Sequence, residues 1–438
     1  MLSNDLREIS RKYPDYLEKV SRNYTWNFFF ILIDSATFSF ALAFLSVDTI
    51  LPYFISHLTD AKIWVGVVSS LYFWGYYFPQ IIGAYFVNVN PLRKWTIFWI
   101  TIAERVGLLM IALLVQFHHL FTPFETLTLF LVFYAIFAIT NGLIGPAYND
   151  FISKSINRHR GIFYGATNAV SGLIGLGASL LIQQMLNRYA FPVNLQILFW
   201  IAFASSFINP FLIANFREVP YPVHRQVESA REFIRKIPET LIKYPVFSKF
   251  LVIRALIGLG LMANSFFAIY AVKEFNLSEG VLGIYTMIIL LTQSALGVIW
   301  GHIGDRFGFK LVYILMTGLL GVQALIALTA HQAWWFYFVP FCIGGVYGAT
   351  RVSDANIIFE IAPPEETSRF LGLSNTLLSP VLAVAPLIGG MLVDRASYSA
   401  LFAVDLTIVI LSIVITIIWL PEPRKHSVKD VDKGVQTL

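Results

Sequence analysis

The chain has 438 residues, of which 57% are hydrophobic, 16% aromatic and only 13% charged. An ordinary soluble domain has about 25% charged residues, and a disordered chain combines low hydrophobicity with high charge, so both classes are excluded. A single cysteine, Cys342, excludes a disulfide framework and a four-cysteine zinc site. The net charge of +5 is spread over tails and loops without a basic stripe, which excludes a nucleic-acid binder. A polytopic membrane protein remains.

Twelve stretches are apolar and long enough to cross a bilayer as helices, which takes about 20 residues each. The sequence therefore predicts an all-α membrane protein with twelve transmembrane helices. In chain order the stretches lie near residues 26–55, 62–88, 93–116, 122–146, 160–186, 193–216, 247–273, 280–303, 309–330, 332–355, 366–392 and 398–420.

A long polar interruption divides the twelve stretches into six and six. We expect two pseudo-symmetric six-helix bundles joined by a cytoplasmic linker and flanked by cytoplasmic tails. Because the first residues are polar and the first apolar run is too long for the core of a signal peptide, no cleavable signal peptide is expected. The expected parts, in chain order, are residues 1–25, 26–216, 217–246, 247–420 and 421–438.

The distribution of Lys and Arg predicts the orientation, because cytoplasmic loops carry an excess of both. With the N-terminus inside, 25 of the 31 fall in cytoplasmic segments, 4 fall outside, and Arg105 and Arg254 fall within spans. Both termini are therefore expected in the cytoplasm. In the linker, apolar residues recur at roughly helical spacing over 227–242, which predicts an amphipathic helix on the membrane surface, kinked or divided at Pro238. The alternative is a solvated linker.

The two halves echo each other. Phe30–Asp34 in the first span resembles Phe250–Arg254 in the seventh, and such internal repeats are typical of transporters. The loop after the eighth span reads G-x-x-x-D-R-x-G-x-K, formed by Gly301, Asp305, Arg306, Gly308 and Lys310. With this motif at this place, the chain resembles the major facilitator superfamily over residues 26–420.

The resemblance implies two bundles that rock about a central site, with the motif loop latching one conformation. Glycines in this loop suit close helix approach and a tight turn, and Asp305 can face a helix N-terminus. The chain also departs from the superfamily's drug–proton antiporters. The corresponding first-half loop, residues 83–94, lacks the aspartate, the fourth span lacks their arginine, and the fifth span lacks their Gly-Pro-x-x-Gly-Gly motif.

Ionisable residues within spans are expensive and mark functional sites by default. Asp34 lies about nine residues into the first span, which the resemblance makes cavity-lining. It is our coupling or substrate candidate, as a proton carrier or as a partner in a salt bridge. Arg254 holds the equivalent place in the seventh span, so we expect it to pair with Asp34 or to bind an anionic substrate.

Other charged residues near spans are given structural or peripheral roles. Glu104 and Arg105 are neighbours that point about 100° apart, so each is expected to find its partner on another helix. Asp48 is expected at the interface and Asp405 near the outer surface. Three residues at the cytoplasmic ends of the fourth and tenth spans suit a cytoplasmic gate or solvated helix ends: Asp150, Arg351 and Asp354.

Uncharged polar and aromatic residues complete the predicted site. Their positions suit a central cavity, where aromatic rings stack a ligand or hold a cation; for most of the aromatics, plain packing and the interfacial belt are the alternative. They are Asn141, Asn264, Gln293, Asn375, Tyr72 and Tyr76.

The chain has no phosphate-binding loop, no H-E-x-x-H and no arrangement of catalytic residues, so we expect no enzyme, no cofactor and no metal. We expect a secondary active transporter that moves a small organic or amphiphilic solute by alternating access, coupled to a proton or another ion. The alternatives are a transport-inactive scaffold or sensor and a facilitative uniporter. The single cysteine and compact loops suggest a bacterial inner membrane, with the lipid bilayer, the solute and the ion as partners.

Overall fold

The computed structural model describes most of the chain, and all regular secondary structure in its described part is helical. Its residues fall into two compact units, which we call unit 1 and unit 2. Unit 1 holds residues 1–45, 78–178 and 191–233; unit 2 holds 46–77, 179–190 and 234–438. The described residues are 13–80, 82–83, 92–222, 235, 237–363 and 366–422.

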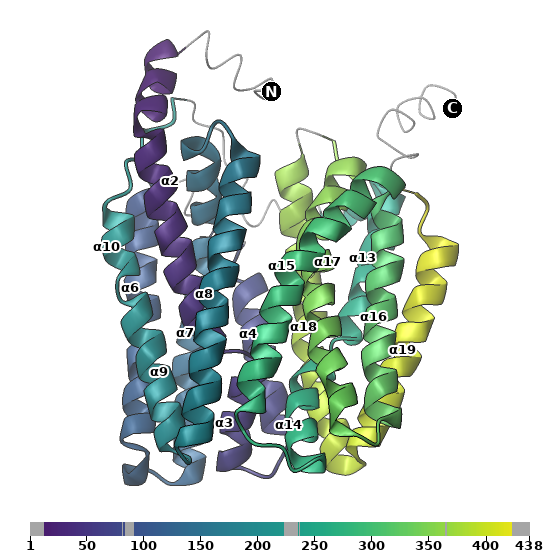
Figure 1. Cartoon of the computed structure of the whole chain (residues 1–438). Coiled ribbons are helices and arrows are strands. Elements are labelled where there is room, and N and C mark those ends of the chain that lie inside the picture. Colours follow the sequence, from purple (N-terminus) through teal and green to yellow (C-terminus); the bar gives the residue numbers. More distant parts are fainter. Residues whose placement is uncertain are drawn as a thin grey trace. The chain divides into compact units, whose positions relative to one another are not determined.

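The predicted all-α membrane fold is confirmed. Ten helices within the described residues are long and apolar enough to cross a membrane. Two further predicted spans coincide with α4 (Ile63–Tyr77) and α17 (Phe338–Ile361), of which α17 carries Arg351, Asp354 and Glu360. Most helices of the described chain are labelled in Figure 1.

Several predicted spans are broken rather than continuous, and the first begins earlier than predicted. The first span consists of α2 (Pro14–Ala43) and α3 (Ile50–Leu58), and the seventh of α13 (Pro245–Leu259) and α14 (Asn264–Glu274). Proline at the first helical position suits the starts of α2 and α13, because its missing N–H would have no partner there. The breaks, which apolar runs alone do not reveal, place short non-helical segments among buried residues.

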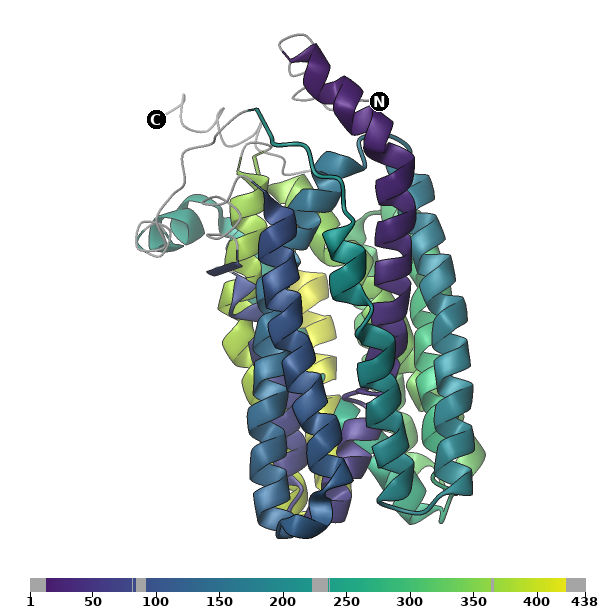
Figure 2. The ribbon, with the colours of Figure 1, turned by 90° about the vertical axis from the view of Figure 1, so that its left-hand side faces the viewer.

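Unit 1 is a bundle in which α6 (Arg93–Gln116) and α7 (Pro123–Ser155) pack along each other, joined by the short η1 (His118–Leu120), as Figures 1 and 2 show. Thr122 and Glu125 form a capping box that fixes the start of α7. The bundle is completed by α2, α9 (Val193–Ser206), α10 (Asn209–Ala214) and the first part of α8 (Arg160–Arg188).

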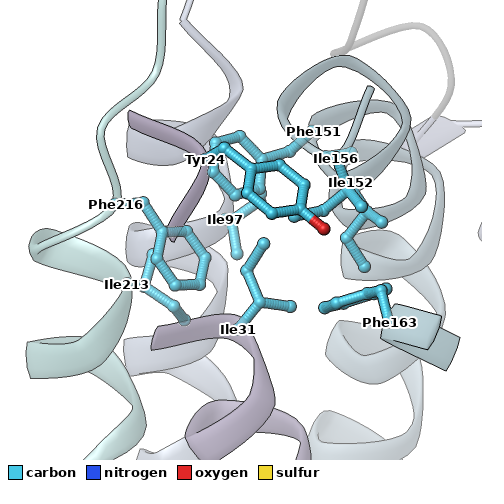
Figure 3. Packing of buried hydrophobic residues seen from close by; sticks show 10 residues of the cluster. Tyr24, Ile31, Ile97, Phe151, Ile152, Ile156, Phe163, Ile213 and Phe216 are labelled. Atoms are coloured by element: carbon cyan, nitrogen blue, oxygen red, sulfur yellow. The ribbon is translucent and has the colours of Figure 1, made fainter. Parts of the chain in front are cut away.

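One end of unit 1 is closed by an aromatic and aliphatic core (Figure 3). Phe151 of α7 stacks on Phe216, with ring centroids 4.7 Å apart, and Ile31 of α2 is fully buried among them. Because the same cluster draws on α2, α6, α7 and α8, it fixes these helices around the polar residues described below. Its other buried members are Tyr24, Ile97, Ala147, Ile152, Ile156, Phe163 and Ile213.

Unit 2 contains α15 packed on α17 and α16 packed on α19, together with α3, α4, α13, α14 and α18. α15 ends and α16 begins at Gly308, whose φ of 96° lies in the left-handed region that glycine adopts without strain. The tight turn predicted at this glycine is therefore present. Of the helices of unit 2, α15 spans Val281–Phe307, α16 spans Phe309–Thr329, α18 spans Thr367–Arg395 and α19 spans Tyr398–Trp419.

Within unit 2, the backbones of α4 and α18 approach each other closely at two glycines. A Cβ atom on Gly66 would meet the Pro386 carbonyl oxygen at 2.3 Å, and one on Gly390 would meet the Ile63 Cα at 2.7 Å. Asp394 caps the start of α4, accepting the N–H groups of Lys62 and Ile63 at 2.7 and 2.8 Å. Small residues allow this approach, as is usual between membrane helices.

Replacing Gly66 with Ala is expected to lower the free energy of unfolding by about 1–3 kcal/mol, because the added methyl group forces α4 away from α18. The measurement is the thermal unfolding of the purified protein in detergent. Gly318→Ala is the control, since a Cβ there meets nothing within 4 Å. An equal effect of the two substitutions would contradict the close approach.

Two predicted features lie wholly or partly outside the described residues. Of the amphipathic segment 227–242, residue 235 and most of α12 (Ile237–Lys243) are described, with Pro238 in the first turn of α12. Most of the first-half loop, residues 84–91, is outside the described part.

Candidate functional site

Asp34 is buried in unit 1 and held by neutral donors. Its carboxylate accepts the Tyr148 hydroxyl at 2.7 Å and the Asn209 side-chain N–H at 2.7 Å. Tyr148 belongs to α7 and Asn209 opens α10, so three helices meet at this carboxylate. No cation is among its hydrogen-bond partners in the described chain, because both bonds come from uncharged groups.

The predicted structural pair in the third span belongs to the same constellation. Arg105 Nη1 contacts Glu104 Oε2 at 2.6 Å, so the expectation that these neighbours do not pair is wrong. Their long side chains turn toward the same buried space despite the angular offset of their Cα–Cβ bonds. Arg105 also donates to the Ser206 carbonyl at 2.8 Å and to Asn209 Oδ1 at 3.1 Å, which links it to Asp34.

Asn141 closes the constellation by donating its amide to Glu104 Oε1 at 3.0 Å. We call the connected group of Asp34, Glu104, Arg105, Asn141, Tyr148 and Asn209 the Asp34 network. It contains two carboxylates and one guanidinium, and all three charged groups are buried. One bound proton therefore makes the network electrically neutral, and without that proton it carries a net negative charge.

Arg254 lies in a second polar group, within unit 2. Its guanidinium forms an ion pair with Asp354 of α17 and donates to Ser374 Oγ at 2.6 Å. The Tyr313 hydroxyl donates to the other oxygen of Asp354. The predicted pair Asp34–Arg254 is therefore wrong, because Asp354 is the partner of Arg254. Arg351, the other residue predicted at this end of the tenth span, is exposed.

The physical reason for this correction lies in the repeat itself. Asp34 and Arg254 hold equivalent positions in the first and seventh spans, and equivalent residues have equivalent surroundings within their own half. Each accordingly finds a partner three spans further along the chain, Tyr148 in the fourth and Asp354 in the tenth.

Replacing Arg254 with Met is expected to cost about 3 kcal/mol of unfolding free energy, because the Asp354 carboxylate, whose side chain is only 15% exposed, would keep its charge without a partner. Arg351→Met, on the same unit but exposed, should change stability by less than about 0.5 kcal/mol. Denaturation of both purified variants tests this. Equal stability of the two would mean that the ion pair carries no net stabilisation.

Asp48 is buried, which corrects its predicted interfacial position. The Tyr347 hydroxyl lies 3.0 Å from each oxygen of its carboxylate. The break between α2 and α3 turns this residue inward. Asp48 lines a small cavity in unit 2 with mostly apolar and aromatic walls, whose other residues are Thr49, Phe267, Ala268, Tyr285, Ile289, Phe336, Val339, Pro340 and Ile343.

The remaining predicted site residues are spread over unit 2. Asn264 accepts the Gln323 amide at 2.8 Å and lies 3.5 Å from the Tyr347 hydroxyl. Tyr72 and Tyr76 stack along α4 with ring centroids 6.2 Å apart. Gln293 and Asn375 are partly exposed. The structure thus joins Asn141 with Asp34 and Asn264 with the surroundings of Asp48.

The residues of the Gly301–Lys310 motif lie at the junction of α15 and α16. Lys310 donates to the Ile417 carbonyl at 3.0 Å, and Asp305 and Arg306 are exposed. Gly304 is closely packed, because a Cβ atom added there would meet the Phe309 ring at 2.2 Å. Gly301 is not closely packed, because a Cβ atom there would meet its nearest neighbour, Val352, at an ordinary contact distance of 3.8 Å.

Asp150 belongs to a charged cluster within unit 1. It accepts Arg93 and Lys154, each at 2.7 Å. Glu218 caps α6 by accepting the N–H groups of Arg93 and Lys94 at 3.0 and 2.8 Å. Burial raises the pKa of the Glu218 carboxyl, although these two hydrogen bonds act in the opposite direction.

Sequence reasoning missed the uncharged partners that define the charged sites. None of these partners stands out in the sequence, because each is a common residue type within an apolar stretch. They are Tyr148, Asn209, Tyr313, Tyr347 and Ser374. The signal that could have found Asn209 is its amide within an apolar span, directly before Pro210, where a polar side chain needs a partner. The tyrosines carry no comparable signal, because tyrosine is common in membrane helices.

The fold is that of polytopic membrane transporters. A crystal structure of a D-xylose–proton symporter superposes with a TM-score of 0.71 at 13% identity, covering 92% of this chain and all of that one. The nucleoside transporter NupG superposes with a TM-score of 0.65 at 14% identity, covering 89% and 97%. At these identities the likeness shows the fold.

Residues 250–437 match the family model of the Major Facilitator Superfamily. Over 126 residues the chain is 26% identical to a class H tetracycline resistance protein of Pasteurella multocida, covering 28% of this chain and 31% of that protein. Over 170 residues it is 25% identical to a class B tetracycline resistance protein of Escherichia coli, covering 38% and 42%. The matches thus span less than half the length of these relatives. Together they support membership of the superfamily, subfamily unspecified, as the motif predicted.

Proposed function

We propose that the protein is a secondary active transporter that moves a small organic or amphiphilic solute by alternating access and couples this movement to a proton. The superfamily match and the transporter fold support the transport activity. The Asp34 network supports the coupling. The first solutes to test follow from the relatives, which are named for resistance to tetracycline and, in Salmonella typhimurium, to methyl viologen.

The observation that carries the proposal is the charge of the Asp34 network. Glu104 and Asp34 share one guanidinium, and Arg105 touches Glu104 directly, whereas Asn209 separates it from Asp34. Burial disfavours an uncompensated charge, so the second carboxylate is the one that takes a proton. Asp34 is therefore the proton carrier, and a change in its hydrogen bonds on solute binding would change its proton occupancy.

The remaining parts of the proposal concern placement in the cell. The asymmetry of Lys and Arg supports two cytoplasmic termini, and we propose the inner membrane of a bacterium. The motif loop with Asp305 and Arg306, together with the Arg93–Asp150–Lys154 cluster, then lies on the cytoplasmic side as a gate that distinguishes the two states.

Transport by purified protein in liposomes tests the proposal. Each solute is supplied over a range of concentrations with an imposed pH difference, with and without a protonophore that collapses it. Saturable uptake that the protonophore reduces to equilibration is the expected result. Saturable uptake that ignores the protonophore would favour a uniporter. Absence of saturable uptake for every solute, in protein that remains folded, would favour a scaffold or sensor.

A further inference from the structure

Asp405 of α19 is fully buried, which corrects its predicted peripheral position. Neither oxygen of its carboxylate has a hydrogen-bond partner within the described chain. A buried ionised carboxylate without donors is very costly, and such a group becomes neutral instead. The Asp34 network does not include Asp405, which belongs to unit 2, so this carboxylate calls for an explanation of its own.

Register places Asp405 beside Asn264. Along α19 and the α13–α14 pair, Lys249 lies over Trp419, Gly260 faces Val409, and Phe267 stacks on Phe402. These contacts advance by 11 and then 7 residues along α13–α14 while they go back by 10 and then 7 residues along α19. The residue of α19 one turn before Val409 is Asp405, and the same step beyond Gly260 reaches Asn264.

Register against α16 gives the third member of this layer. Lys310 contacts Ile417, and a Cβ on Gly321 would meet Val409 and Leu406. The two helices are therefore antiparallel, and Asp405 falls at the level of Gln323. Gln323 is fully buried, and its Oε1 also lacks a partner in the described chain. Three oxygens without donors, one of Gln323 and two of Asp405, thus share one layer.

The neighbouring hydrogen bonds all run in one direction, away from Asp405. Gln323 donates to Asn264 at 2.8 Å, the Asn264 amide lies 3.5 Å from the Tyr347 hydroxyl, and Tyr347 donates to the Asp48 carboxylate at 3.0 Å. With its N–H group committed to Asn264, Gln323 presents an acceptor at the open end. The Gln323 Oε1 atom therefore lacks one hydrogen-bond donor.

Among the described residues of the helices packed on α19, no charged side chain is a hydrogen-bond or ion-pair partner of Asp405. Tyr270 of α14 packs its ring on Phe402, which precedes Asp405 by three residues on α19. The other titratable groups are engaged elsewhere or belong to helix ends: Lys249 and Arg254 on α13, Lys273 and Glu274 on α14, Lys310 and Tyr313 on α16, and Arg369, Asp394 and Arg395 on α18.

We propose that Asp405 is a proton-binding site: it is held as a neutral carboxylic acid that donates to Gln323 Oε1 and completes the chain ending at Asp48. A metal ion is the rival occupant, but no group of three or more His, Cys, Asp or Glu side chains in the described residues suits one. The proposal concerns the resting protein and does not depend on transport.

Infrared spectroscopy of the purified protein tests the protonation state. A carbonyl-stretch band of a protonated carboxylic acid should be present at neutral pH, disappear in Asp405→Asn, and persist in Asp60→Asn, where an exposed aspartate is replaced. A spectrum in which Asp405→Asn removes no such band would overturn the proposal.

Two substitutions test the donated hydrogen. Asn at position 405 still offers an N–H to Gln323, so Asp405→Asn should melt within experimental error of the unmodified protein. Asp405→Leu leaves Gln323 without a donor and should melt roughly 2–4 °C lower. Equal losses in both variants would contradict the neutral acid. The melting temperature is also measured with increasing Na⁺ and with choline at equal ionic strength. A saturable increase that Na⁺ alone produces, and that Asp405→Asn abolishes, would mean that the site binds a cation instead of a proton.

Discussion

Arg105→Met is expected to lower the free energy of unfolding by about 4–5 kcal/mol, the upper part of the range for breaking a buried ion pair. The substitution keeps an apolar side chain of similar length but removes the guanidinium that contacts Glu104, Asn209 and the Ser206 carbonyl. Two buried carboxylates would then remain without a positive charge. Chemical denaturation of the purified variant measures the loss.

A double variant separates the charge from the packing. In Arg105→Met with Glu104→Gln, the guanidinium and one carboxylate disappear together, so much of the lost stability should return. Arg158→Met is the matched control, because among the described residues this exposed arginine has a cation–π contact with Tyr24, worth about 1 kcal/mol or less. If the double variant were no more stable than Arg105→Met, uncompensated charge would not explain the loss.

Asp34→Asn is expected to abolish concentrative transport while leaving exchange intact. A pH difference of one unit corresponds to about 1.4 kcal/mol, or tenfold in an equilibrium ratio. With the membrane potential clamped to zero and one proton per neutral solute, the unmodified protein should therefore reach about a tenfold solute gradient. The asparagine variant should equilibrate the solute, because the amide keeps the shape and hydrogen-bonding capacity of the side chain but binds no proton.

The control for this variant lies on the same helix. Asp15 is exposed in the first turn of α2, so Asp15→Asn should retain the full gradient. Exchange of labelled against unlabelled solute, which needs no net proton movement, should remain in both variants. Full accumulation by Asp34→Asn would assign the proton to another group.

The fold could be predicted because each membrane span requires its own apolar run, which can be recognised in the sequence without knowing the other spans. The apolar runs and the Gly301–Lys310 motif pointed to the superfamily that the family model also supports, whereas the breaks within spans left no such pattern in the sequence. The break between α2 and α3 depends on how the surrounding helices accept unpaired backbone groups. It moves Asp48 from the expected interface into the interior.

The charged residues of the site could be predicted, but their partners could not. Asp34 and Arg254 were recognised as intramembrane charges, since each stands alone in an apolar stretch. Their partners, Tyr148 and Asn209 for one and Asp354 for the other, come from helices far away in the sequence. Such contacts depend on helix register and rotation, which one sequence does not record. Neighbouring Glu104 and Arg105 paired because side-chain length outweighed their angular separation.

The central claim is that Asp34 exchanges a proton when solute binds or is released. The most direct measurement is the pH change in a weakly buffered solution of the purified protein on adding a transported solute, repeated with Asp34→Asn and Asp15→Asn. We predict up to one proton taken up or released per solute bound for the unmodified protein and Asp15→Asn, and none for Asp34→Asn. A proton change of the same size in Asp34→Asn would contradict the account.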